Sequence, residues 1–108
     1  MASLILASSS EVRRRLLLGA GLRFRVQPPD VAEAPIKARC RAEGLDATGT
    51  ALELAAAKAR AVSLIDGEAY VIGADQMLEA GNDWFDKPDG TDGLRATLRR
   101  LSGREHRL

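Results

Sequence analysis

The order of features at the start of the chain constrains its fold more than any other part of the sequence. The continuous apolar run from Leu4 to Ala7 is typical of a buried strand. In residues 11–19 the apolar positions Val12 and Leu16 recur at helical spacing. Three serines, residues 8–10, separate the two patterns. The sequence therefore predicts a strand that ends in a hydroxyl-rich turn, and a helix that begins directly after it.

Such a turn is suited to binding an anion. The first N–H groups of a helix have no partner within the helix, and the positive end of the helix dipole lies there. Ser8 and Ser10 add hydroxyl donors, and Arg13 adds a planar cation about one turn into the helix. These residues predict a phosphate-binding turn. The same residues would also occur if Ser10 simply capped the helix and the arginines were solvated. The turn alone does not decide between a phosphate-binding turn and a helix cap.

Composition and charge bound the class of protein. The chain has 108 residues, 45% hydrophobic and 29% charged, which predicts one globular domain over residues 1–108. The formal net charge of +1 is too balanced for a dedicated nucleic-acid or membrane-surface protein, so neither partner is expected. Cys40 is the only cysteine and cannot form an internal disulfide. The N-terminal apolar stretch is too short for a signal peptide, and we expect a cytoplasmic location.

Strand and helix patterns alternate along the chain, which predicts an α/β fold with helices packed on a sheet. Further strands are expected at residues 24–26 and 70–74, a hairpin from 77–79 and 84–85, and helices at about 50–63 and 91–101. Residues 30–50 are predicted to be a loop with at most a broken helix around 35–43. Residues 106–108 resemble the start of another strand.

Two of these elements carry more detailed expectations. The uninterrupted apolar run at 70–74 indicates a central strand that is buried on both faces. In the helix at 50–63, one face is expected to lie against the sheet; its residues are Leu52, Ala55, Ala59 and Val62.

A carboxylate, Asp75, follows the predicted strand at 70–74. In open α/β sheets ligands bind outside the carboxyl ends of the strands, so Ser8 and Asp75 should lie at one edge. A phosphate-binding turn beside a carboxylate suits a phosphoanhydride reaction assisted by a divalent ion, with Asp75 holding the ion or activating water. The alternative is that Asp75 caps the hairpin. Lys87 follows the hairpin and either neutralises a phosphate or is an ordinary solvated lysine.

Six short motifs occur in the order in which Maf proteins carry them. They are LILASSS (4–10, followed by Arg13 and Arg14), PDVAE (29–33), AKARA (57–61), VIGADQ (71–76), DKP (86–88) and LSGREH (101–106). The chain therefore resembles the Maf family, which is named for septum-formation inhibition and contains nucleoside triphosphate pyrophosphatases. The resemblance implies a mixed sheet flanked by helices, of the Maf and inosine triphosphatase type.

The resemblance also implies an activity and a set of site residues. The implied reaction splits a nucleoside triphosphate between its α and β phosphates, with Mg²⁺ or Mn²⁺, to give the monophosphate and pyrophosphate. The implied catalytic residue is Asp75, which would share the metal with Glu33; the implied substrate-binding residues are Ser8, Ser10, Arg13, Lys58, Gln76 and Lys87. Without the resemblance, Glu33 is a loop carboxylate and Lys58 a solvated helix residue.

The chain departs from the family pattern in three respects. Glu11 replaces a proline that often follows the second motif serine, which adds negative charge near the phosphates. Gln76 replaces the threonine of the branch associated with thymidine and uridine triphosphates, so the chain looks closer to branches that act on other or modified bases, including methylated guanosine triphosphate. Maf proteins normally continue well beyond His106, so a truncated sheet is expected. Its open edge favours a homodimer.

Other interpretations are weaker but distinct. A non-catalytic nucleotide or nucleic-acid binding module with a role in division control would also agree with truncation and with the clustered arginines. A P-loop protein is disfavoured because the Gly-x-x-x-x-Gly-Lys pattern is absent. We expect His106 to be structural, and we expect Trp84 and Phe85 to be packing anchors rather than a stacking surface for a base.

Overall fold

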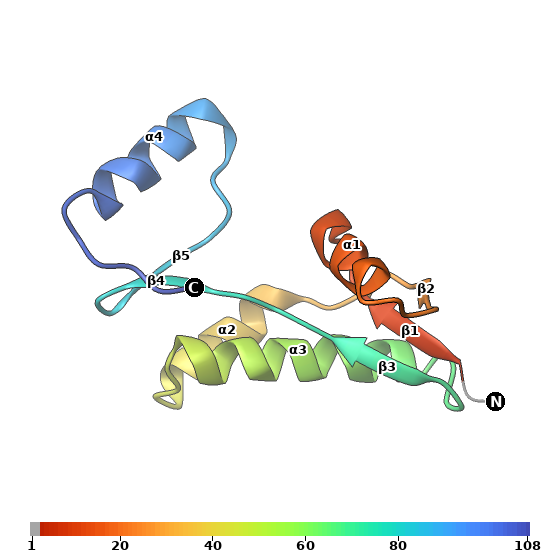
Figure 1. The fold of residues 1–108 in the computed structure, drawn as a ribbon. Helices are drawn as coiled ribbons and strands as arrows, with labels where there is room; N and C mark the ends of the chain where they lie inside the picture. Colours follow the sequence, from red (N-terminus) through yellow and green to blue (C-terminus); the bar gives the residue numbers. More distant parts are fainter. Residues whose placement is uncertain (1–2) are drawn as a thin grey trace.

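The computed structural model describes residues 3–108, and the predicted alternation of strands and helices is confirmed (Figure 1). The elements in chain order are β1 (Leu4–Ala7), α1 (Glu11–Gly19), β2 (Arg25–Val26), α2 (Glu33–Ala42), α3 (Ala47–Ser63), β3 (Tyr70–Gly73), β4 (Leu78–Ala80), β5 (Asp83–Phe85) and α4 (Gly90–Leu101). No helix among these residues is long and apolar enough to cross a membrane.

The main sheet brings the ends of two strands together. Its order is β2-β1-β3, and β1 runs parallel to both neighbours. Ala7 of β1 is paired with Gly73 of β3, so both strands end at the same edge of the sheet. The residues that follow each strand, Ser8 on one side and Asp75 on the other, therefore lie at one edge, as the sequence predicted.

The central strand is β1 and not β3, so the expectation for residues 70–74 was wrong. Ile5 and Leu6 of β1 are each 1% exposed, whereas Tyr70 of β3 is 71% exposed. Within residues 3–108, β3 has a strand on one side only. An apolar run shows that a strand has a buried face, but it does not show how many strands flank it.

The expectation of a loop over residues 30–50 was also wrong. Residues 33–42 form the uninterrupted helix α2, because Pro35 lies in its first turn, where the missing N–H group has no helical partner to lose. Gly44, with φ +79, ends the helix in the left-handed region. Asp46 then caps α3, since its Oδ1 accepts the Gly49 N–H at 2.7 Å. The glycines and the proline therefore lie at the ends of two helices and interrupt neither helix.

Helix α3 is buried along a stripe that repeats every fourth residue. Thr50, Leu54 and Val62 are fully buried, and Lys58 occupies the remaining position of that stripe. Val62 packs with Ile5 and Ala7 of the sheet, and Leu54 packs with Ala47 and Met77. Leu52, expected on the inner face, is instead 68% exposed. The prediction is thus wrong at Leu52, whereas Val62 is buried and Ala55 and Ala59 lie against Gly73 of β3, as expected. The buried stripe places Lys58 inward, which the predicted face did not include.

Strand β3 crosses α3 at very close range. A Cβ atom added to Gly73 would lie 2.1 Å from the Ala55 carbonyl oxygen and 3.0 Å from the Ala59 Cβ. Only glycine allows this approach, because such a distance is far inside van der Waals contact. The crossing holds the end of β3 directly over the helix that carries Lys58.

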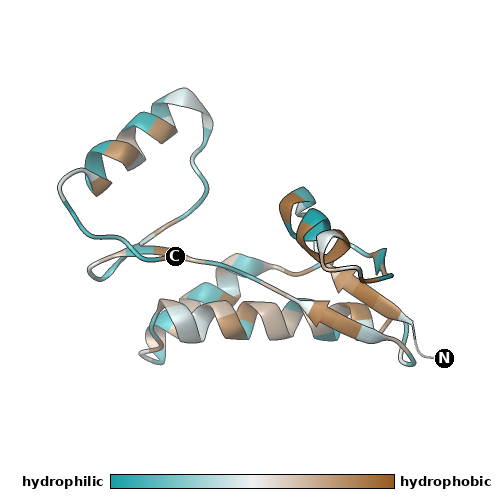
Figure 2. Cartoon of the chain, in the orientation of Figure 1, coloured by the Kyte–Doolittle hydropathy of each residue, from teal (hydrophilic) through white to brown (hydrophobic). Residues whose placement is uncertain are grey.

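The hairpin and the last helix form the other end of the molecule. Strands β4 and β5 are antiparallel, as predicted, and Arg107 exchanges two backbone hydrogen bonds with Glu79 of β4. Helix α4 stands apart from α3 (Figure 1). Figure 2 shows apolar segments on α4 and α1, where Leu98 and Leu16 are 56% and 67% exposed. The radius of gyration is 15.8 Å, above the ~13 Å of a compact chain of this length.

Candidate active site

The serine turn, residues 8–10, begins the site. Ser8 is buried, and its Oγ accepts the Ser10 N–H at 3.0 Å. Ser10 is the N-cap of α1, where its Oγ accepts the Arg13 N–H at 3.2 Å. The capping interpretation of Ser10 is therefore confirmed. It does not exclude anion binding, because a hydroxyl that accepts a hydrogen bond still has its own O–H to donate.

Arg13 connects the serine turn to the end of β3. Its guanidinium donates from Nη1 to the Ala74 carbonyl oxygen at 3.3 Å. Ala74 directly precedes Asp75, so this bond ties α1 to the backbone that carries the carboxylate. A guanidinium has further N–H donors in the same plane. Arg13 can thus hold Ala74 and still face a phosphate.

Asp75 and Lys58 form a nearly buried ion pair. Lys58 Nζ lies 2.8 Å from Asp75 Oδ2, and the two side chains are 13% and 10% exposed. The other oxygen, Oδ1, accepts the Gln76 N–H at 2.7 Å. Oδ2 is buried beside this ammonium and has no hydrogen-bond partner among the described residues. Lys58 is therefore a nearly buried, paired lysine beside the candidate site and not a solvated helix lysine.

Glu33 is the second carboxylate near Lys58. It begins α2, and its Oε1 lies 3.7 Å from Lys58 Nζ. Its side chain is about half exposed. The expectation that residue 33 lies in a loop was wrong, because the helix begins at this residue. Its position in the first turn fixes the carboxylate beside α3.

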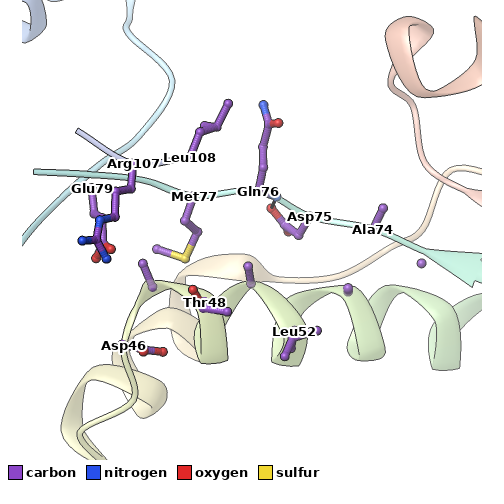
Figure 3. A pocket seen from close by; sticks show the side chains of 14 residues that line it. Asp46, Thr48, Leu52, Ala74, Asp75, Gln76, Met77, Glu79, Arg107 and Leu108 are labelled. Atoms are coloured by element: carbon purple, nitrogen blue, oxygen red, sulfur yellow. Dashed lines mark hydrogen bonds between the residues drawn. The ribbon is translucent and has the colours of Figure 1, made fainter. Parts of the chain in front are cut away.

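The strand segment after β3 presents alternate side chains to opposite sides. Figure 3 shows Asp75 and Met77 pointing toward α3 and Gln76 pointing away from it. Met77 packs with Ala47 and Leu54 in the interior. Gln76 is exposed and faces away from this core. The alternation thus places Asp75 on the same side as the packing residue Met77, toward α3, and Gln76 on the opposite side.

All eight site residues implied by the family resemblance line one or the other of two adjoining hollows. The serine-turn hollow, about 410 Å³, is lined by all six expected substrate-binding residues: Ser8, Ser10, Arg13, Lys58, Gln76 and Lys87. The acidic hollow, about 690 Å³, is lined by Glu33 and Asp75 and shares Gln76 and Lys87 with the first. Three cations thus surround the first hollow, and the carboxylates line the second.

Lys37 is a charged residue of the acidic hollow that was not predicted from the sequence. Its Nζ lies 2.8 Å from Asp86 Oδ1. The hydrogen bond to Asp86 raises the Lys37 pKa above 10.5 against the opposing effect of burial, and the charges of Glu33 and Asp75 add to the increase. The signal was its spacing, four residues after Glu33, which becomes one helix face only when residues 33–42 are recognised as a helix.

Trp84 and Phe85 are packing residues, as expected. Trp84 packs against the buried cluster that contains Leu54, and Phe85 is 8% exposed. Arg41 lies over the Trp84 ring at 4.2 Å, and Arg100 lies over the Phe85 ring at 4.4 Å. These arginines occupy ring faces that a base would need.

The carboxylates suit a divalent ion only together with other oxygen ligands. The described part of the chain holds no cluster of three or more histidine, cysteine or acidic residues that is suited to a metal. Glu33 and Asp75 supply two carboxylates, and Asp75 Oδ2 contacts the Lys58 ammonium but has no hydrogen-bond partner in residues 3–108. Mg²⁺ is commonly held by one or two carboxylates plus substrate phosphates and water. The residues therefore fit Mg²⁺ or Mn²⁺ when a phosphate ligand lies in the adjoining hollow.

The fold defines an α/β protein whose candidate site lies at the carboxyl ends of parallel strands. Residues 3–108 match the family model described as Maf-like protein, and the chain belongs to this family. The resemblance drawn from the six motifs is thus confirmed.

Three relatives illustrate the similarity. A nucleoside triphosphate pyrophosphatase of Nitrobacter hamburgensis is 49% identical over 97% of this chain and 51% of its own length. One of Rhodospirillum rubrum is 44% identical over 96% and 52%. A 7-methyl-GTP pyrophosphatase of Mesorhizobium japonicum is 42% identical over 97% and 53%. The chain spans about half the length of the curated relatives it matches.

Proposed function

We propose that this chain carries the catalytic residues of a nucleoside triphosphate pyrophosphatase, which hydrolyses the bond between the α and β phosphates. The observation that carries the proposal is the Lys58–Asp75 pair, with 2.8 Å between Nζ and Oδ2, directly beside the serine-turn hollow. The relatives of this chain, which include a nucleoside triphosphate pyrophosphatase and a 7-methyl-GTP pyrophosphatase, support it.

The serine-turn hollow would bind the phosphate chain. Ser8 and Ser10 offer hydroxyl donors at the N-terminus of α1, where the helix dipole also favours an anion. Arg13 adds a planar guanidinium held by Ala74, and Lys87 lines the same hollow. Together these groups would neutralise the oxygens of a triphosphate and fix its direction toward Asp75.

Asp75 would act on the attacking water. It lies where the two hollows adjoin, and its Oδ1 is fixed by the Gln76 N–H. The neighbouring Lys58 ammonium compensates its charge and holds its orientation. A carboxylate fixed in this way can orient water or take its proton. Glu33 and Asp75 would hold the divalent ion, which when bound polarises the phosphoryl oxygens.

The proposal also includes the class of nucleotide that the site would accept. We infer a modified or non-canonical nucleotide because Gln76 lines the hollow where one family branch has threonine. The 7-methyl-GTP pyrophosphatase of Mesorhizobium japonicum, 42% identical, supports this choice. A panel of canonical and methylated triphosphates would rank the substrates directly.

The test of the activity is the release of pyrophosphate by the purified chain with Mg²⁺ or Mn²⁺. We expect stoichiometric monophosphate and pyrophosphate from at least one triphosphate of the panel. If none is released while a longer relative turns over under the same conditions, the proposal fails for this chain. Binding with a steep salt dependence and no turnover would favour the non-catalytic binding module instead.

We further propose that the chain forms a homodimer in the cytoplasm. The apolar residues Leu16 of α1 and Leu98 of α4 are exposed, and contact with a second copy would cover such residues. The single free thiol of Cys40 suits a reducing compartment. Sedimentation at several concentrations would reveal a dimer, and a monomer at all concentrations would contradict this part.

A further inference from the structure

The segment that carries Lys87 has little support of its own. Residues 86–89, the linking segment, connect β5 to α4 and are all exposed. In the described part of the chain, no backbone hydrogen bond outside the helices and strands involves these residues. Asp89 makes no side-chain capping bond to α4. Lys87 nevertheless has to lie over the serine turn to line the hollow there.

One side-chain contact ties the linking segment to the helix layer. Lys37 Nζ lies 2.8 Å from Asp86 Oδ1, and the Lys37 side chain is only 29% exposed. Lys37 is on α2, four residues after Glu33, and α2 itself packs on α3. The contact therefore joins the residue next to Lys87 to the framework that holds Glu33 and Lys58.

We propose that Lys37 is a positioning residue, which holds Lys87 over the serine-turn hollow through its ion pair with Asp86. This inference rests on the proposed function of that hollow as a phosphate site. Without the pair, no ion pair or loop backbone hydrogen bond among the described residues holds the linking segment between its two ends, and Lys87 spends less time at the hollow. Lys37 acts through Asp86 and need not touch the phosphate itself.

The test is the binding of inorganic tripolyphosphate, measured by calorimetry on the unaltered chain and on variants. Lys37→Met and Asp86→Asn should each weaken binding by a similar factor, about three- to tenfold, the usual size for one lost polar contact. The double variant should bind no more weakly than either single one, because both changes break the same pair. Lys37→Arg should restore most of the affinity.

A matched control lies on the same helix. Arg39 also forms exposed ion pairs, with Glu43 and Glu53 at 3.5 and 3.4 Å, but it does not line either hollow. Arg39→Met should bind tripolyphosphate like the unaltered chain. With a nucleotide that is turned over, Lys37→Met should raise KM several-fold and change kcat less, which a general loss of folding would not do.

Three outcomes would contradict the positioning role of Lys37. If Lys37→Met weakens binding and Asp86→Asn does not, Lys37 contacts the phosphate directly and the positioning role is wrong. If both variants bind like the unaltered chain, the pair does not position Lys87. If the unaltered chain does not bind tripolyphosphate at all, the proposed phosphate site fails, and the inference fails with it.

Discussion

Lys58 of α3 and Asp75 after β3 lie 2.8 Å apart, and each side chain is nearly buried. The pair joins the long helix to the end of an edge strand, at the point where two hollows adjoin. Removing one partner of a buried pair leaves the other charge without compensation, which costs more than the pair contributes. The structure and the proposed chemistry therefore depend on the same contact.

Lys58→Met is expected to destabilise the chain. It leaves Asp75 buried and Glu33 nearby with no ammonium between them, and the loss should approach the ~3 kcal/mol that is typical of breaking a buried pair. Urea unfolding measures this loss. Arg60→Met, an exposed position on the same helix, should change the free energy of unfolding by less than about 0.5 kcal/mol.

A second variant separates charge from packing. Lys58→Met combined with Asp75→Asn removes both charges and should recover part of the lost stability, because the buried carboxylate is then gone. A double variant that is destabilised by the sum of both single changes would show that the two residues act independently, contrary to the 2.8 Å contact.

Asp75→Asn should remove turnover but leave much of the affinity for a nucleotide. The change removes the carboxylate that would activate water, whereas the serine turn and Arg13 remain. Loss of a general base typically lowers kcat by about 10²- to 10⁴-fold. Single-turnover kinetics and direct binding measure the two effects. The control is Asp83→Asn, because Asp83 is an exposed acid of the hairpin that is paired with Arg104. Equal losses of rate and binding would contradict this division of roles.

Arg13→Ala should weaken binding of a triphosphate more than it lowers kcat. The guanidinium lines the serine-turn hollow and also holds the Ala74 carbonyl oxygen. Its loss removes a phosphate contact worth about 1.5–3 kcal/mol when charged groups are involved, or about tenfold or more in affinity. Arg15→Ala is the control, because Arg15 is exposed and contacts only Glu11 among the described carboxylates. Similar affinities for both variants would remove Arg13 from the site.

The sequence predicted the position of the site better than the packing around it. Ser8 and Asp75 follow strands, and parallel strands that end in register must bring them to one edge. The inward position of Lys58 was not predicted from the helix pattern. A lysine on an alanine-rich helix looks solvated, because only Thr50, Leu54 and Val62 mark the buried stripe and alanine fits either face.

The helix that carries Glu33 and Lys37 was missed for a local reason. Pro35 and Gly44 resemble loop residues in a window of sequence, yet one lies in a first turn and the other ends the helix. Whether such residues break a helix or only mark its ends depends on where the helix begins. Packing on α3 fixes where α2 begins. The Lys37–Asp86 contact spans 49 positions and leaves no local pattern at all.

The charge of Glu11 is already compensated at the start of α1. Its carboxylate accepts a hydrogen bond from Arg14 Nε at 2.9 Å and also contacts Arg15. The Arg14 hydrogen bond lowers the Glu11 pKa below 4.5, against the opposing effect of desolvation, and the Arg14 charge and the Arg15 hydrogen bond add to the decrease. The negative charge that this residue adds near the serine turn is thus held by two arginines.

The lowered Glu11 pKa gives a prediction about pH. Because the folded pKa is below the unfolded value, the pair stabilises the chain above about pH 4.5, and this contribution is lost as pH falls through the folded pKa. A nuclear magnetic resonance titration of the Glu11 carboxyl should give a midpoint below 4.5. In Arg14→Gln the midpoint should rise. A midpoint unchanged by that substitution would show that Arg14 is not the cause.

Gly73→Ala tests whether the crossing of β3 and α3 sets the site. The added methyl would lie 2.1 Å from the Ala55 carbonyl oxygen, so strand and helix must separate. Overpacking of this kind costs about 1–3 kcal/mol, and backbone cannot rotate away as a side chain can. Gly67→Ala is the control, because its nearest neighbour, the Ser63 oxygen, would be 3.9 Å away. Lys58 and Asp75 come from the two elements that would move apart, so Gly73→Ala should reduce turnover beyond its effect on urea unfolding. Full turnover by the folded Gly73→Ala fraction would show that the close crossing is needed for stability alone.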